Sequence, residues 1–381
     1  MPLSNRDIVE LTEWRRKLHQ RPEISGEEEK TAAEVAAFLE PTTPDRLMRG
    51  LGGHGLAAFY ESGRPGPTLM FRCELDALPI VECTEAPHRS EISGKGHLCG
   101  HDGHMAILAG VARGLACRRP ESGRVILLFQ PAEETGAGAA AILADPRFAE
   151  IAPDFAFALH NFPGLRLGHV ALKDGAAACA SRGMKITLTG RTAHASQPET
   201  GLSPMPAIAR LMPELTALAA GGALVEDFSL VTITHAAMGE PAFGIAPGEA
   251  EIFATLRTLQ DARMEALVAR AEALVAEMAG AFGLSFDIAY EDVFFASDND
   301  PDAVAHLRVA LDHERIFHSP GEPMRASEDF GRFGASAKSA LLFLGAGETH
   351  PPLHDPEYDF PDDLIAIGAR IFLRTAYDIL G

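Results

Sequence analysis

Two uninterrupted apolar runs constrain the fold of this chain more than any other feature of its sequence. They are VILLFQ (125–130) and FAFALH (155–160), and neither alternates apolar and polar residues as a strand with one wet face does. Strands of this kind are covered on both faces, as in the sheets of α/β proteins. Because helical and strand-like segments alternate around these runs, the sequence predicts an α/β domain.

A second domain interrupts the first. After residues 174–180, which are small and featureless, the expected order is strand, helix, strand, strand, helix, strand. That order completes a ferredoxin-like layer by itself. We therefore expect a discontinuous domain over residues 1–177 and 293–381, with an inserted domain over residues 178–292. A chain of 381 residues with 46% hydrophobic content supplies enough apolar material for two cores.

The first 39 residues have the pattern of two amphipathic helices separated by Pro22. Ser25 precedes the second helix and Glu28 follows three residues later, which is the pattern of a capping box. Both helices would open the first domain.

Composition and charge exclude several classes of partner. The formal net charge is −20 and no Lys/Arg cluster offsets it locally, so we expect no binding to nucleic acid or to an anionic membrane surface. The five cysteines lack the regular spacing of a disulfide framework, which favours a reducing compartment. The N-terminal residues lack the apolar core of a signal peptide, and no later stretch is apolar for long enough to span a membrane. These features predict a cytoplasmic protein.

The segment HLCGHDGH (97–104) concentrates potential metal ligands just before a predicted helix. Cys99 and His101 are two residues apart, so an extended backbone would place both side chains on one face. A lone Cys or His would more often have a core or surface role, but this density reverses the preference. Asp102 would serve equally well as a helix cap or as a partner of the helix dipole in the first turn, and His104 as a packed group behind the ligands.

Two adjacent carboxylates, Glu133 and Glu134, follow the first apolar run. The carboxyl ends of strands are where open α/β sheets form their sites, although two exposed loop carboxylates are the simpler alternative. In a metal enzyme, one carboxylate can bind a metal ion while the other moves a proton from the attacking water to the leaving nitrogen. The spacing alone does not say which glutamate has which role.

Histidines at the ends of other segments extend this pattern. His160 ends the second apolar run, and His350 and His354 lie in a Pro-rich loop near the C-terminus. Taken singly, each is as often incidental as functional, but four separate segments that offer Cys, His or Glu are what a metal centre requires. Five ligands exceed the three usual for one catalytic zinc ion, which indicates two ions that share a ligand. A thiolate favours zinc or another softer transition metal over magnesium or calcium.

Over nearly its whole length, the chain resembles the amidohydrolases typified by hippurate hydrolase and the auxin-conjugate hydrolases, a branch of the dinuclear metallopeptidases. The resemblance implies a mixed-sheet α/β metallopeptidase domain with an inserted ferredoxin-like α+β domain that acts as a lid or in dimerisation. It implies two divalent metal ions per subunit, zinc or manganese, and a homodimer or higher homo-oligomer formed through the lid. The implied reaction is hydrolysis of the amide bond of an N-acyl amino acid. The segments that carry the resemblance are WRRKLHQRPEISGEE (14–28), ELDALPI (74–80), HLCGHDGH, FQPAEE (129–134), LHNFPG (159–164), GRTAHASQP (190–198), SEDF (327–330) and PLHDP (352–356).

The same resemblance implies a role for each candidate site residue. Glu133 matches the general base. His194, in the inserted domain, matches a lid histidine that reaches a substrate carbonyl, in many relatives across a dimer interface; without the resemblance it is more simply an exposed loop residue. The implied metal ligands are Cys99, bridging the two ions, His101 and His160 on one ion, and Glu134 and His354 on the other.

Two positions depart from the pattern of these relatives. Glu74 stands where they commonly have Asp, and Gly244 stands where they commonly have an Asn that anchors substrate. Arg257 is the candidate to bind the substrate carboxylate instead. The alternatives to an N-acyl amino acid hydrolase are a dipeptidase or a small-metabolite N-deacetylase. The alternatives outside enzymes are a structural zinc protein, in which Glu133 would be superfluous, and a catalytically silent metal-binding protein.

Overall fold

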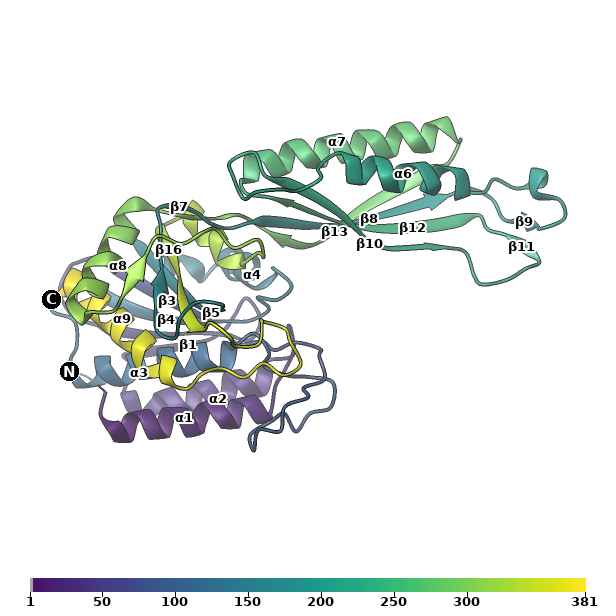
Figure 1. Cartoon of the computed structure of the whole chain (residues 1–381). Helices are drawn as coiled ribbons and strands as arrows, with labels where there is room; N and C mark the ends of the chain where they lie inside the picture. Colours follow the sequence, from purple (N-terminus) through teal and green to yellow (C-terminus); the bar gives the residue numbers. More distant parts are fainter. Residues whose placement is uncertain (1–2) are drawn as a thin grey trace. The chain divides into compact units, whose positions relative to one another are not determined.

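The computed structural model describes residues 3–381 and divides into two compact units (Figure 1). The first unit contains the chain up to Ala177, together with Ser297–Glu322 and Glu328–Gly381. The second contains Ala178–Ala296 and the short segment Pro323–Ser327. The second unit thus starts where the predicted insertion starts, and it also takes in residues 293–296 and 323–327.

A mixed eight-stranded sheet forms the centre of the first unit. The strands β3, β4, β5 and β16 are mutually parallel, whereas β2 runs antiparallel to β4 and β1 antiparallel to β2. The predicted α/β class with a mixed sheet is confirmed. In spatial order the strands are β1 (Arg46–Leu51), β2 (Gly55–Glu61), β4 (Arg124–Gln130), β3 (Thr68–Glu74), β5 (Phe155–Pro163), β16 (Lys338–Gly347), β6 (Val170–Ala171) and β15 (His318–Ser319).

Helices cover this sheet and explain why its central strands are apolar throughout. Six of the seven residues of β4 are buried, as a strand covered on both faces requires. The helix α3 packs against β3, α1 and α9 (Figure 1). The helices of the unit are α1 (Asn5–Gln20), α2 (Glu29–Leu39), α3 (His101–Cys117), α4 (Gly138–Ala144), α5 (Phe148–Ile151), α8 (Pro301–Glu314) and α9 (Asp363–Leu380), with the 3-10 turns η1 (Glu40–Thr42) and η3 (Asp329–Ala335).

The predicted capping box at the start of α2 is wrong. Ser25 donates its hydroxyl to Asp76, and Glu28 accepts from the backbone N–H groups of Gly26 and Ala132. The side chain of Glu23 instead accepts from the backbone N–H and the hydroxyl of Thr31, in the first turn of α2. Long-range partners therefore replace the local pairing that the sequence pattern suggested.

The second unit has the predicted order of elements. Its four long strands form one antiparallel sheet in the order β10-β12-β8-β13. Two helices lie side by side on this sheet, and side chains from the sheet and the helices make a separate hydrophobic core (Figure 1). The elements are β8 (Ala180–Thr189), α6 (Met205–Ala217), β10 (Ser229–Met238), β12 (Glu249–Thr258), α7 (Asp261–Ala281) and β13 (Ser285–Phe294), with the short pieces β9 (Ala193–His194), η2 (Pro198–Thr200) and β11 (Ile245–Ala246).

Two further short strands, β7 (Gly175–Ala178) and β14 (Ser297–Asn299), pair with each other. Over residues 3–381, every helix is too short or too polar to cross a bilayer.

Candidate metal centre

The five predicted metal ligands meet in two overlapping groups within the first unit. Within each group, one ligand atom per residue lies within 4.8 Å of the others. Cys99 belongs to both groups, which is the arrangement expected of a ligand shared by two ions. The first group is Cys99, His101 and His160, and the second is Cys99, Glu134 and His354.

The fold brings these residues together because each lies at the end of an element or in an adjoining loop. Cys99 precedes Gly100, whose left-handed backbone (φ 89°) starts α3, and His101 is the first residue of that helix. Glu134 follows β4, and His160 lies in the second half of β5. His354 comes from the loop between β16 and α9 and has a left-handed backbone of its own (φ 68°). The loop is thereby turned so that the Nε2 of His354 lies 3.4 Å from a carboxylate oxygen of Glu134.

Backbone carbonyls fix the ring orientation of the two buried histidines. The Nδ1 of His101 donates to the carbonyl of Asp76 at 2.9 Å, and the Nδ1 of His160 donates to the carbonyl of Asn161 at 2.8 Å. The Nε2 atom of each ring is then left with a free lone pair. The Nε2 of His160 lies 3.5 Å from the thiol sulfur of Cys99.

Two buried polar atoms at this site lack a hydrogen-bond partner among residues 3–381. They are the Nε2 of His101 and one carboxylate oxygen of Glu134. A buried polar atom without a partner is costly, and a metal ion would satisfy both atoms. The residues present therefore fit a centre for divalent metal ions.

The buried thiol and carboxylates of the site also favour a bound cation. Burial raises the pKa of the Cys99 thiol well above its usual value, and the carboxylates of Glu134 and Glu133 raise it further. A cation would be needed to keep this thiol as a thiolate. Although burial lowers the pKa of His101, the neighbouring carboxylates, Asp76 first among them, raise it to about 10, and a metal ion at Nε2 would take the place of the proton that they favour.

Glu133 and Glu134 occupy different surroundings although they are adjacent in the chain. One carboxylate oxygen of Glu134 has no hydrogen-bond partner among residues 3–381. The backbone N–H of Glu134 donates to a carboxylate oxygen of Asp76 at 2.9 Å. Glu133 is buried, and one of its oxygens lies 3.4 Å from the backbone N–H of Asp329. Burial raises the pKa of Glu133 well above its usual range, and the nearby carboxylates of Glu328 and Glu134 add to this effect. Glu133 belongs to neither of the groups that share Cys99, although it lies within ligand distance of His101 and Glu134 in a further group.

A fully buried arginine, to which no motif in the sequence points, compensates part of the acidic charge. Arg72 pairs with Glu328 at 3.0 Å, with Asp329 at 2.5 Å and with Glu74. The Nδ1 of His104 in turn lies 2.6 Å from the other oxygen of Glu74. The longer Glu74, where relatives commonly have Asp, therefore joins Arg72 to His104. The motif SEDF offered a signal for two of these partners, but no local pattern connects it to Arg72.

Three remaining candidates in this unit lie outside the two groups that share Cys99. Asp102 does not cap α3, because it accepts from Arg15 at 3.2 Å and pairs with the Nδ1 of His19 at 2.9 Å. His104 packs behind the ligands, and its Nε2 accepts from the backbone N–H of Asn161. His350 is held by its contact with the carbonyl of Asp359 at 2.7 Å, so His354 alone of the two loop histidines joins the groups.

His194 and Arg257 belong to the second unit. His194 is exposed in β9, where its Nδ1 accepts from the backbone and hydroxyl of Ser196. Arg257 lies in β12 and donates to the hydroxyl of Ser327 at 2.9 Å. Among residues 3–381, no carboxylate pairs with Arg257, so its charge is left uncompensated within the described chain.

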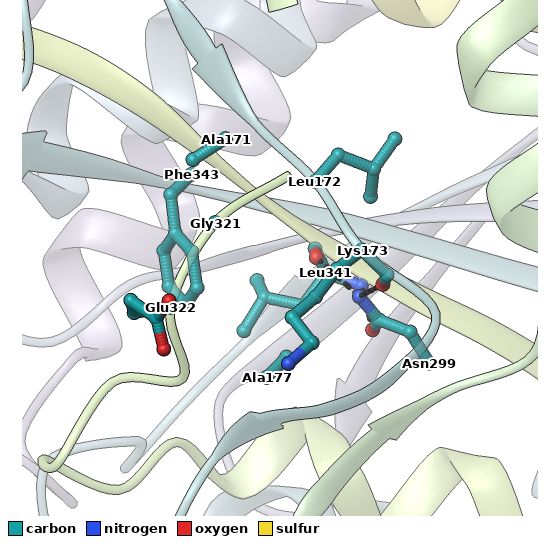
Figure 2. A pocket seen from close by; sticks show the side chains of 9 residues that line it. All are labelled: Ala171, Leu172, Lys173, Ala177, Asn299, Gly321, Glu322, Leu341 and Phe343. Atoms are coloured by element: carbon teal, nitrogen blue, oxygen red, sulfur yellow. Dashed lines mark hydrogen bonds between the residues drawn. The ribbon is translucent and has the colours of Figure 1, made fainter. Parts of the chain in front are cut away.

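A narrow crevice elsewhere in the first unit does not qualify as a site. It lies around Lys173, Asn299 and Glu322 (Figure 2). The side chain of Asn299 is fully used there, because it donates to the carbonyls of Lys173 and Leu341 and accepts from the N–H of Leu341. None of the crevice-lining residues belongs to a group of potential metal ligands in the described chain.

Comparison with known proteins agrees with this geometry. The profile of Peptidase family M20/M25/M40 matches residues 70–378. Hippurate hydrolase from Campylobacter jejuni is 30% identical over 374 residues, which covers 97% of each chain. N-acetylcysteine deacetylase from Bacillus subtilis is 26% identical over 374 residues, again with 97% of each chain covered. Among solved structures, the YXEP protein of Bacillus subtilis, described as a dinuclear metal binding peptidase from M20 family, has the same fold, with a TM-score of 0.83 at 24% identity and 99% of each chain covered.

The family profile covers most of the chain, and the likeness to hippurate hydrolase extends over nearly all of both proteins. The five predicted ligands, which lie in segments that resemble this family, converge in the structure. The chain is therefore an amidohydrolase that belongs to Peptidase family M20/M25/M40.

Proposed function

We propose that this enzyme hydrolyses the amide bond of an N-acyl amino acid with the help of two divalent metal ions, zinc or manganese. The observation that carries the proposal is the position of Glu133, a buried carboxylate beside two ligand groups that share Cys99 but outside both. A centre that served only to hold the fold would have no use for such a carboxylate.

The metal ions would be held by the two ligand groups, with Cys99 common to both. Bound there, two divalent ions lower the pKa of water and polarise the carbonyl of the amide. The chain contributes ligands whose free lone pairs are already aimed, because the carbonyls of Asp76 and Asn161 hold the rings of His101 and His160. This preorganisation also explains why both histidines are buried.

Glu133 would act as the general base and then as the general acid. Burial and the neighbouring carboxylates raise its pKa, which makes the Glu133 carboxylate a stronger base toward the proton of the attacking water. It would then deliver that proton to the leaving nitrogen of the amide. The backbone N–H of Asp329 lies 3.4 Å from one oxygen of Glu133, and the other oxygen, 3.9 Å from the Nε2 of His101, faces the centre.

The substrate class is supported by the chemistry of the second unit and by the relatives. Arg257 is half-buried and has no carboxylate partner in the described chain, which suits it to bind the carboxylate of an amino acid. His194 would donate to the substrate carbonyl. Hippurate hydrolase, N-acetylcysteine deacetylase and N-acetyldiaminopimelate deacetylase are all named for N-acyl amino acids. We further propose a homodimer or higher homo-oligomer formed through the inserted domain.

A substrate panel combined with two matched variants tests this proposal. The panel contains N-benzoyl, N-acetyl and N-indoleacetyl amino acids, with dipeptides alongside. Glu133→Ala should retain its metal ions while kcat falls by a factor of about 10² or more. Glu134→Ala should lose metal as well as activity, because Glu134 is a ligand.

Unchanged turnover by Glu133→Ala would remove Glu133 from the mechanism. Turnover of dipeptides alone would replace the proposed substrate with that of a dipeptidase.

A further inference from the structure

The residue before the two site glutamates has an unfavourable backbone conformation. Ala132 has a φ of 49°, in the left-handed region that alanine rarely adopts because its Cβ crowds the following carbonyl. Unlike Asn or Asp, alanine has no polar side chain to stabilise this conformation locally. Interactions with other residues must therefore stabilise Ala132 in this conformation.

Both backbone polar groups of Ala132 are held. Its carbonyl accepts from the N–H of Gly138 at 2.9 Å, within the turn itself. Its N–H donates to a carboxylate oxygen of Glu28 at 2.8 Å, and the two residues are 104 positions apart. The left-handed turn at Ala132 reverses the chain directly after β4, at the point where Glu133 and Glu134 must face the ligand groups.

Glu28 has few other functions to explain its burial. Its side chain is fully buried, and the oxygen that accepts from Ala132 also accepts from the N–H of Gly26 at 2.9 Å. Its other oxygen has no partner among residues 3–381. Glu28 is the N-cap residue of α2, but its side chain makes no capping hydrogen bond, and Glu23 is the residue whose side chain accepts from Thr31 in the first turn of that helix. A buried carboxylate is costly, so a specific role is expected of it.

We propose that Glu28 is a positioning residue for the hydrolysis. It fixes Ala132 in the left-handed conformation and thereby aims Glu133 at the candidate centre. This inference rests on the proposed function, because it concerns the delivery of Glu133 to the reaction. It predicts a loss in kcat when the contact with Ala132 is removed, with little change in KM or in bound metal.

Three substitutions at Glu28 test the contact. In Glu28→Ala the acceptor is removed, so kcat should fall by about 10-fold or more, while KM stays within about threefold and the metal content is unchanged. Glu28→Asp withdraws the carboxylate by one methylene and should lower kcat in the same direction. Glu28→Gln keeps an oxygen that can accept from Ala132 and should retain kcat within about threefold of wild type. If the Ala variant does not fold, the comparison of Asp with Gln decides the question alone.

A matched control separates positioning from stability. Glu23→Ala disrupts the neighbouring contact to Thr31 at the start of α2 without touching Ala132. It should lower the melting temperature without lowering kcat. If Glu23→Ala lowers kcat as much as Glu28→Ala does, the role of Glu28 is structural and the proposal is overturned.

The substitution Ala132→Gly distinguishes a positioning role of Glu28 from a purely structural one. Glycine adopts a positive φ without the Cβ penalty, so a glycine at position 132 should depend less on Glu28 to stay in the left-handed conformation. In the Glu28→Ala background, Ala132→Gly should raise kcat by about threefold or more. A crystal structure of Glu28→Ala should show Ala132 outside the left-handed region. Absence of rescue, or an unchanged φ at Ala132, would contradict the proposal.

The two proposals fail in distinguishable ways. If the wild type turned over no N-acyl amino acid, the proposed function would fail, while the backbone of Ala132 in the Glu28→Ala crystal would still report on the contact. If the wild type is active and both Glu28→Asp and Glu28→Ala match its kcat, only the role of Glu28 is wrong.

Discussion

Asp76 supports the candidate centre with both its backbone and its side chain. Its carbonyl accepts from the Nδ1 of His101, and one carboxylate oxygen accepts from the N–H of Glu134 and from the hydroxyl of Ser25. One residue therefore holds a ligand from each of the two groups. A substitution can remove the side-chain contacts, which reach the N–H of Glu134 and the Nδ1 of His101, the latter at 3.5 Å.

Asp76→Ala should weaken metal binding by about 10- to 100-fold, the usual effect of losing a group that orients a ligand. Competition with a chromogenic chelator measures this affinity. Ser25→Ala is the matched control, because it removes one donor to Asp76 but leaves the contact to Glu134 in place. Equal losses in the two variants would show that the contact to Glu134 is not what matters.

The buried network around His19 should make stability depend on pH. Although burial lowers the pKa of His19, the carboxylates of Asp102 and Glu82 raise it to about 9, against 6.5 in the unfolded chain, and Arg15 opposes them. A raised pKa means that the stabilisation is complete below pH 6.5 and is lost as the pH rises through 9. From the two pKa values, the loss is about 3 kcal/mol of the free energy of unfolding.

Urea unfolding of wild type and His19→Gln between pH 6 and pH 10 tests this expectation. The difference in free energy between the two proteins should shrink as the pH rises. A difference that stayed constant across this range would show that His19 is not charged in the folded protein.

The helix α3 positions His101, which is its first residue. The helix approaches Phe360 so closely at Gly103 that a Cβ there would lie 2.3 Å from the ring. At Gly110, in the same helix, the nearest atoms are side-chain methyl groups at 3.1 Å, which need shift only slightly. A side chain is therefore accommodated more easily at Gly110 than at Gly103.

Gly103→Ala should destabilise the protein by about 1–3 kcal/mol through overpacking against Phe360, although alanine is the better helix former. Gly110→Ala should be close to neutral, because the gain of up to about 1 kcal/mol in helix propensity offsets a small shift of its neighbours. Chemical denaturation of both variants measures the difference. A stable Gly103→Ala would show that the loop carrying Phe360 yields easily.

The elements that the sequence predicted best are those with a strong local signal. The strands β4 and β5 coincide with the runs VILLFQ and FAFALH almost residue for residue, because burial on both faces leaves an unmistakable apolar pattern. The capping box at Ser25 and Glu28 failed because both side chains bind partners that are distant in the sequence. Arg72 was missed for the same reason, since its partner Asp329 is 257 positions away.

At the scale of the whole molecule, the two units have separate hydrophobic cores, and all five proposed ligands lie in the first unit. The segment order in the sequence anticipated the inserted unit, whereas convergence of the ligands followed only from the resemblance and the fold. Metal should therefore stabilise the first unit selectively.

Calorimetry with and without a chelator tests this selectivity. Removing metal should lower the unfolding temperature of the first unit, because each ion contributes about 4 kcal/mol to its free energy of unfolding if metal is present at 1,000 times its dissociation constant. The transition of the second unit should stay where it is. Equal shifts of both transitions would indicate that the units unfold together or that metal binds elsewhere.

The central claim is that five side chains hold two ions while Glu133 stays unbound beside them. Anomalous diffraction from crystals grown with zinc or manganese tests it most directly. The account predicts two peaks per chain, both in contact with the sulfur of Cys99, with His101 and His160 on one, Glu134 and His354 on the other, and no bond to Glu133. A single peak, a peak bound to Glu133, or peaks elsewhere in the chain would contradict it.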